Sequence, residues 1–117
     1  MPKSPLYQDI YAAIRTIPFG EVASYSQVAK SVGLPRGAQV VGWALGALSG
    51  LENTDIPWWR VINAKRWLTI TNKQAGPADQ KLWLEKEGRT VTEKEGVFVV
   101  DGEDWWDAPV VPPRGAF

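Results

Sequence analysis

The stretch Pro57-Trp58-Trp59-Arg60-Val61 places two adjacent tryptophans between a proline and an arginine, outside any helical spacing of apolar residues. Aromatic side chains of this size can stack on a flat ligand, and an arginine beside them can brace the loop. The chain contains no cysteine and no histidine. Thiolate nucleophiles, disulfides and the commonest zinc ligands are therefore excluded. The carboxylates lack calcium-loop spacing, so we expect a binding loop without a metal or a cofactor.

Length and composition predict one globular domain. The chain has 117 residues, of which 44% are hydrophobic, and this is enough for a modest core. We expect a single domain over residues 1–117, with an irregular tail at about 101–117 that docks through Trp105 and Trp106. No apolar run is long enough to span a membrane. We therefore expect no membrane partner and a cytoplasmic protein, nucleoid-associated in a bacterium or nuclear in a eukaryote.

The formal net charge is zero, but the charges are divided unevenly along the chain. Residues 1–75 carry eight lysines and arginines against four acids, whereas residues 76–117 carry five against nine. The resulting balance of +4 and −4 could turn the N-terminal part toward phosphates and the C-terminal part away from them. Many neutral proteins divide in this way, so the charge pattern alone identifies no partner.

Spacing and capping signals predict a mainly α-helical fold with small β elements. Ser24 and Gln27 have the spacing of a capping box, and Gly33 is suited to end the helix that follows. Glu95-Gly96 is a turn signal between two short alternating segments. The expected helices are residues 5–17, 25–32, 36–48 (ended by Ser49-Gly50) and one between Gly76 and Gly88, and the expected strands are residues 67–71 and a hairpin within 90–101.

Residues 25–32 and 36–48 are joined by a short Gly-Leu-Pro turn, which is the outline of a helix-turn-helix. In such a motif the second helix is the candidate DNA reader. The same outline also fits an ordinary helical hairpin that packs a core. The spacing alone leaves both interpretations open.

Four segments in order, FGEVASYSQVAKSVGLP, RGAQVVGWAL, IPWWRVIN and LWLEKEG, resemble the C-terminal DNA-binding domain of the alkylguanine-DNA alkyltransferases. The resemblance covers about residues 5–89 and implies a winged helix-turn-helix-like fold. The family's active loop reads Pro-Cys-His-Arg-Val, with the cysteine as alkyl acceptor. Here Trp58 stands at the cysteine position and Trp59 at the histidine position, as in the alkyltransferase-like proteins. Glu87 matches the family's glutamate but has no relay to serve, so we do not expect an alkyltransferase.

The resemblance implies a pocket that receives an extruded O6-alkylguanine. Extruding a base costs on the order of a few kcal/mol, and aromatic stacking can offset roughly 1–3 kcal/mol per base. Trp58 is the expected lesion contact, whereas Trp59 fits equally well as a buried filler of the vacated histidine site. The residues expected to form the pocket are Trp58, Trp59, Tyr25, Pro57 and Val61.

The resemblance also implies DNA contacts. Tyr25 matches the tyrosine that crowds the 3′ phosphate of the target and helps to rotate the nucleotide out, or it simply packs the first turn of its helix on the helix before. Arg60 matches the loop arginine, which we interpret as mainly a brace. Ser24 and Gln27 could contact phosphates or simply cap their helix. The expected DNA-binding residues are Tyr25, Ser24, Gln27, Arg36, Gln39, Ala38, Gly42 and Arg60.

The chain departs from the family in two places. The family has an arginine in the recognition helix that fills the gap left by the flipped base, and the alignment puts Gln39 there, which lacks the charge and the guanidinium plane. Arg36, one turn earlier, could contact phosphate instead. Gly37 is expected to weaken the same helix slightly. Arg66 and Trp67 stand where the family has a glycine-containing turn, so we expect a different loop shape near residues 64–72.

These observations favour a non-enzymatic, monomeric sensor that binds duplex DNA, preferably with O6-alkylguanine, and flags the lesion for nucleotide excision repair proteins. The alternative is a winged-helix transcriptional regulator without lesion recognition, although residues 36–48 offer only Arg36 and Gln39 for base reading. A third interpretation is a protein-interaction module, which would show no salt-dependent DNA binding.

Overall fold

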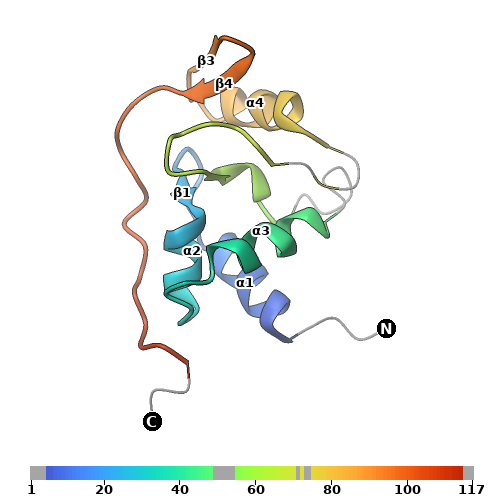
Figure 1. Ribbon diagram of the computed structural model, residues 1–117. Helices are drawn as coiled ribbons and strands as arrows, with labels where there is room; N and C mark the ends of the chain where they lie inside the picture. The colour runs from blue at the N-terminus through green and yellow to red at the C-terminus, as the bar shows by residue number, and fades with distance from the viewer. Residues whose placement is uncertain (1–4, 49–54, 71, 73–74, 115–117) are drawn as a thin grey trace.

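The computed structural model describes residues 5–48, 55–70, 72 and 75–114. The first three helices of the chain gather at one end of the molecule, and the last helix with an antiparallel hairpin forms the other (Figure 1). A short strand pair lies between these two ends. The arrangement confirms the predicted fold class, which is mainly α-helical with small β elements.

Helix α1, Pro5–Arg15, buries one face around Ile10 and Ile14. Its apolar residues recur at three- and four-residue steps, which places them on that face. The Tyr11 hydroxyl donates to the Ala44 carbonyl at 2.6 Å and fastens α1 to the third helix. The helix ends two residues before the predicted residue 17, because the chain tightens there into hydrogen bonds that reach back only three residues.

Helices α2, Tyr25–Ser31, and α3, Ala38–Gly46, pack on each other as a helix-turn-helix. The predicted capping box at the start of α2 is confirmed. The Gln27 amide donates to Ser24 Oγ at 3.1 Å, and the Ser24 amide donates to Gln27 Oε1 at 2.9 Å. The two helices are therefore fixed by local sequence signals at one end and by apolar packing along their length.

The turn between α2 and α3 requires two glycines. Gly33 has φ +77°, and a Cβ there would lie 2.8 Å from the Pro112 carbonyl oxygen. A Cβ on Gly37 would lie 2.6 Å from Cβ of Leu34. The expected weakening of the helix by Gly37 is wrong, because this glycine is the N-cap of α3 and not part of its interior. The predicted helix end at Ser49-Gly50 lies outside the described residues.

The tryptophan loop is positioned by a parallel strand pair. Sequence patterns do not indicate this pair. Strand β1, Ala23–Ser24, pairs with strand β2, Val61–Ile62. Strands of two residues show no measurable alternation, and so they escape prediction. The pairing brings the start of α2 beside η1, the 3₁₀ turn Trp58–Arg60 that contains both tryptophans.

The second end of the molecule is built from α4, Pro77–Lys86, and the antiparallel strands β3, Val91–Lys94, and β4, Val97–Val100. Glu95 and Gly96 connect the strands with φ values of +52° and +82°. Two successive positive φ values are typical of the type I′ turn that suits a two-residue hairpin loop. The predicted hairpin and its turn are therefore confirmed.

The strand predicted over residues 67–71 is wrong. Only Trp67 forms a β-bridge, with Val99, and the residues that follow it have no strand structure as far as the described part extends, since residue 71 lies outside it. Leu68 and Ile70 are buried, so the alternation is real. It reflects two side chains that pack into the core from an extended loop rather than a sheet strand.

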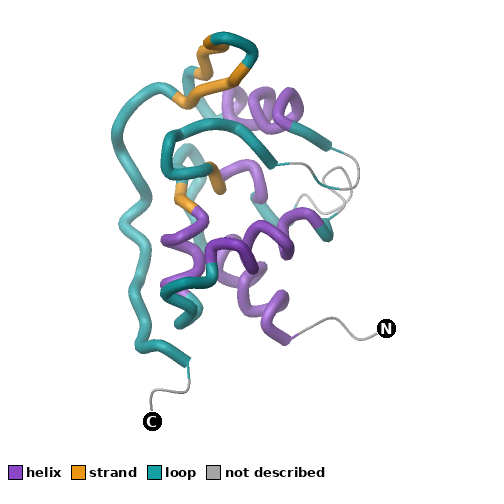
Figure 2. The backbone as a smooth tube through the Cα atoms, in the orientation of Figure 1, coloured by secondary structure: helices purple, strands orange, loops and turns teal. Residues whose placement is uncertain are grey.

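Residues 101–114 contain no helix or strand and run down one side of the molecule from the end of β4 past α2 (Figure 2). Backbone hydrogen bonds tie this segment to the helix-turn-helix: the Trp106 amide donates to the Val22 carbonyl at 2.8 Å, and the Arg114 amide to the Gly33 carbonyl at 2.9 Å. The last part of the expected tail, residues 115–117, lies outside the described residues. Among the described helices, none has the length and apolar character to cross a membrane.

Candidate nucleic-acid interface

The tryptophan loop is buried. Trp58 has no exposed surface and Trp59 is 4% exposed, and their rings meet edge to face with centroids 5.9 Å apart. Trp59 also stacks on Trp83 of α4, at 4.4 Å between centroids. Pro57 and Val61, on either side of the pair, are buried as well. The four loop residues predicted to form a pocket thus lie together within the hydrophobic core.

Glu87, at the C-terminal end of α4, is the polar centre behind this loop. Its carboxylate accepts a hydrogen bond from the Trp59 indole at 2.7 Å, from the Gly20 amide at 2.9 Å and from the Arg60 guanidinium at 2.8–3.1 Å. Arg60 also donates to the Ile17 carbonyl at 2.7 Å. Arg60 is therefore a brace in this structure, as interpreted from the sequence, because protein acceptors occupy its guanidinium.

The electrostatics of Glu87 match a structural acceptor rather than a proton carrier. Burial raises the pKa of its carboxyl, but the hydrogen bonds from Arg60, Gly20 and Trp59 outweigh burial and hold the pKa below its usual value. The group is thus an anion at neutral pH. Sequence reasoning matched Glu87 to the family without assigning it a function, because its partners lie 27 to 67 residues away.

Tyr25 connects α2, α3 and the loop that follows β2. Its ring lies against Gly42, where a Cβ would sit 3.5 Å from Tyr25 Cε2. Burial raises the pKa of the Tyr25 hydroxyl, and a hydrogen bond with the Thr69 side chain partly opposes this effect. Tyr25 is half-buried. Gly42 therefore serves close packing of α2 on α3, and part of the tyrosine stays accessible.

Ser24 and Gln27 are occupied by protein contacts. Besides the capping box, the Gln27 side-chain amide donates to the Trp106 carbonyl of the C-terminal segment at 2.7 Å. Both side chains are partly exposed, and they line a hollow with Ala64 and Trp105. The structure accounts for them as a helix cap that also holds the tail.

The outward face of α3 carries the remaining predicted residues. Arg36 and Gln39 are exposed, whereas Ala38 and Gly42 are half-buried. Sequence reasoning missed Trp43, which is 57% exposed on the same helix. The signal was available, because position 43 lies outside the buried set Val41, Ala44 and Leu45.

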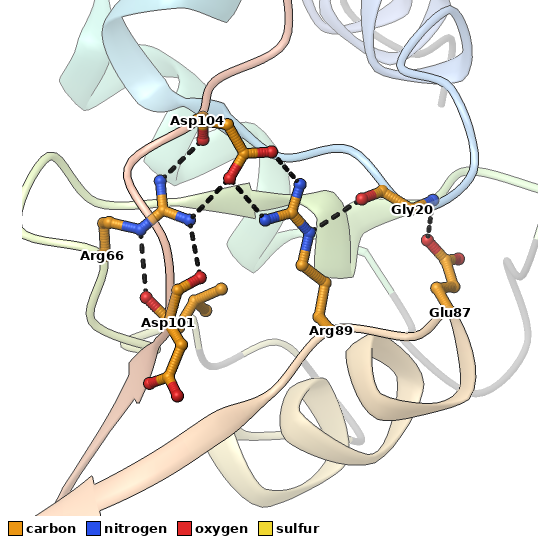
Figure 3. A network of polar contacts seen from close by, with 7 residues as sticks. Gly20, Arg66, Glu87, Arg89, Asp101 and Asp104 are labelled. Carbon is orange, nitrogen blue, oxygen red and sulfur yellow. Dashed lines mark hydrogen bonds and ion pairs between the residues drawn. The ribbon is translucent and has the colours of Figure 1, made fainter.

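A second polar network fastens the tail to the loop after β2 (Figure 3). Arg66 has φ +67° and donates to the carbonyls of Val100, Asp101 and Asp104. Arg89 forms a two-point ion pair with the Asp104 carboxylate. Hydrogen bonds from Arg89 lower the pKa of Asp104 to about 2. In this loop Arg66 is an arginine in a left-handed conformation that holds three carbonyls, and the expected difference in shape from the family stays a prediction.

The described residues contain no group of three or more potential metal ligands. Together, the helix-turn-helix with an exposed second helix, the braced loop at its side and the hairpin define a small DNA-binding fold. The chain belongs to the family described as 6-O-methylguanine DNA methyltransferase, DNA binding domain, whose model matches residues 5–89.

Within this family the chain is similar to an alkyltransferase-like protein and to a DNA base-flipping protein. It is 38% identical over 88 residues to alkyltransferase-like protein 1 of Schizosaccharomyces pombe, and the aligned region covers 75% of this chain and 80% of that protein. It is 40% identical over 84 residues to a DNA base-flipping protein of Vibrio parahaemolyticus, and the aligned region covers 72% of this chain and 80% of that protein. The chain is thus an alkyltransferase-like relative.

Solved structures agree with this assignment. The S. pombe Atl1 protein in complex with damaged DNA containing O6-carboxymethylguanine superimposes with a TM-score of 0.71 at 33% identity, over 86% of this chain and 93% of that one. A Mycobacterium tuberculosis OGT in complex with DNA gives a TM-score of 0.63 at 31% identity, over 74% of this chain and 51% of that one.

Proposed function

We propose that this protein is a non-enzymatic sensor of DNA damage. It binds duplex DNA through α2 and α3, receives a flipped O6-alkylguanine beside the tryptophan loop, and marks the site for nucleotide excision repair. The proposal rests on a similarity of fold combined with a missing residue type. The fold matches that of a protein solved with O6-carboxymethylguanine DNA, and the chain has no cysteine to accept an alkyl group.

The braced loop supports binding without chemistry. Alkyl transfer requires a thiolate with a base to activate it, and here Trp58 and Trp59 fill those two positions with side chains that cannot react in this way. Glu87 binds the Trp59 indole instead of serving a relay. The loop that carries Trp58 is already fixed by these hydrogen bonds, so binding a base has to order only the side chains that cover the ring.

In the proposed complex, Tyr25 and Trp58 are the nearest contacts of the lesion, with Pro57 and Val61 forming the apolar floor. Trp58 is fully buried in the free protein, so a base can reach its ring only by displacing the side chains that cover it. Trp59 acts from behind, since its ring is held between Trp58 and Trp83. Aromatic stacking of roughly 1–3 kcal/mol per base would offset much of the extrusion cost.

The test is a titration with two matched duplexes, one with O6-methylguanine and one with guanine, at a single salt concentration. We expect tighter binding to the lesion duplex, and the preference is expected to fall in Trp58→Ala. Trp105→Ala, a half-buried tryptophan of the tail, is the control for a general loss of aromatic packing. Thermal melting of each variant separates loss of binding from loss of fold.

Equal affinity for the two duplexes would overturn the sensor. A strong consensus from a selection on random duplexes would then support the alternative, a winged-helix regulator. The absence of any salt-dependent DNA binding would support a protein-interaction module. The link to repair has its own readout. Adding the protein to a reconstituted excision reaction is expected to increase incision at O6-methylguanine, and no increase would remove that part of the proposal.

A further inference from the structure

We propose that Trp43 is a DNA wedge, an indole on α3 that inserts between base pairs when the helix-turn-helix lies on a duplex. The inference rests on the proposed function, since it needs α3 to face DNA. It adds to that function a distorting residue separate from the tryptophan loop. Trp43 is not among the residues that sequence analysis expected to contact DNA.

The position of Trp43 on its helix puts the ring outside the fold. Its side chain is 57% exposed, whereas Val41, Ala44 and Leu45 of the same helix are at most 1% exposed. Gln39, one turn earlier, is also exposed, and residues four apart lie on one face of a helix. Trp43 and Gln39 therefore point away from the core in the same direction.

Several neighbours of Trp43 on this face are small. Gly42 precedes it, Gly46 and Ala47 follow one turn later, and Gln39 and the half-buried Val40 lie one turn earlier. Gly42 is small because Tyr25 of α2 packs against it, with Cε2 3.5 Å from the place of a Cβ. The indole consequently protrudes beyond the small residues at positions 42, 46 and 47, and none of its neighbours one turn away on the helix carries a second aromatic ring that would keep it from entering a groove.

The chemistry of an isolated indole suits insertion better than sequence reading. Reading the major groove takes several hydrogen-bond donors and acceptors, and an indole has one donor. Apolar side chains that enter the minor groove instead separate adjacent base pairs and kink the duplex. A separated step has already lost stacking, so the base beside it leaves the duplex at lower cost. Trp43 would thus aid the flipping that the proposed function requires.

A fluorescent base reports the wedge directly. We would place 2-aminopurine next to O6-methylguanine in one duplex and next to guanine in another, because its emission rises when it is unstacked. The wild-type protein is expected to raise the emission, and Trp43→Ala is expected to lose most of the rise and to bind roughly 5- to 100-fold more weakly. Trp43→Phe keeps an aromatic ring and is expected to retain part of both signals.

Leu82→Ala is the matched control, because Leu82 is 54% exposed on α4 and lies outside the helix-turn-helix. It is expected to leave both signals unchanged. Trp43→Lys separates insertion from charge: lysine can attract phosphate, so affinity is retained or raised while the emission rise is lost. If Trp43→Ala raised the emission as much as the wild type does, the wedge would be overturned. The same holds if Trp43→Ala bound DNA with unchanged affinity.

The proposed function and the wedge fail in different ways. The sensor is overturned if the wild-type protein shows no preference for the lesion, measured as the ratio of its affinities for the O6-methylguanine and guanine duplexes. The guanine duplex with 2-aminopurine still tests the wedge in that case, because insertion needs no lesion. Melting curves show whether a Trp43 variant is folded, and the phenylalanine and lysine variants test the proposal even if the alanine variant is not.

Discussion

At the scale of single residues, Glu87 is the side chain on which the tryptophan loop depends. Its carboxylate has 4% exposure and its partner guanidinium 14%, so removing one charge leaves the other buried without a partner. We expect Glu87→Gln to lower the free energy of unfolding by about 3–5 kcal/mol, measured by urea denaturation. Glu85→Gln, which breaks an exposed pair with Lys81 on the same helix, is expected to cost less than about 0.5 kcal/mol.

The same residue predicts a pH dependence. The pKa of Glu87 is lower in the folded protein than its ordinary value of 4.5, so the folded state holds fewer protons than the unfolded state in the range between the two. The contribution of Glu87 to stability is therefore complete above about pH 4.5 and is lost as the pH falls through the folded pKa. The difference between wild type and Glu87→Gln is expected to shrink on acidification. A constant difference down to acidic pH would contradict this role.

The contrast between Glu87 and Trp58 shows where residue-scale prediction ends. The residue types alone exclude a thiolate nucleophile, and the order of the motifs places Trp58 and Arg60 in one loop. The burial of a side chain cannot be predicted in this way, because it depends on residues from distant parts of the chain that pack against it. Trp58 was expected at a pocket wall and has no exposed surface. Glu87 receives donors from two separate segments, one at Gly20 and one at Trp59 and Arg60, which no local pattern records.

At the scale of elements, the C-terminal segment and the helix-turn-helix depend on each other at Gly33. Gly33→Ala would bring a Cβ to 2.8 Å from the Pro112 carbonyl in addition to its unfavourable φ of +77°. Gly88→Ala is the control, since it has φ +90° and no heavy atom within 4 Å. A positive φ alone costs about 1–2 kcal/mol in each. We expect Gly33→Ala to cost more than Gly88→Ala in urea denaturation, and to expose residues 101–114 to limited proteolysis. Equal costs would show that the tail moves away freely.

Elements with local signals could be predicted, and those without them could not. The capping box, the apolar spacing of α1 and the Glu95-Gly96 turn are each contained within a few residues. The pair β1–β2 joins residues 38 positions apart, so its two short strands carry no pattern of their own. The segment after Arg66 shows true alternation yet forms one bridge, Trp67 with Val99. Its buried residues, Leu68 and Ile70, pack into the core from an irregular loop.

At the scale of the whole molecule, the uneven charge distribution along the chain corresponds to separate regions of the fold. The hairpin β3–β4 that carries Glu93 and Glu95 lies at the opposite end from α1, α2 and α3 (Figure 1). Arg36 and Lys30 are exposed on or beside the helix-turn-helix. Phosphates bound along α3 would therefore meet positive side chains, and the acidic hairpin would lie away from them. This layout leaves the hairpin and the exposed acids of the tail free to meet a protein partner.

Charge reversal tests this layout. Glu93→Lys, Glu95→Lys and Glu103→Lys are each expected to leave affinity for duplex DNA unchanged or to raise it, because a distant positive charge adds only weak, screened attraction. Arg36→Glu is the contrasting variant: affinity is expected to fall, and the slope of log affinity against log salt to lose about one unit, since one phosphate contact is removed. Fluorescence anisotropy across a salt series measures both quantities. A marked loss of affinity in these glutamate-to-lysine variants would instead place the acidic half of the chain on the DNA, and the molecule would then have to bind its duplex across both ends.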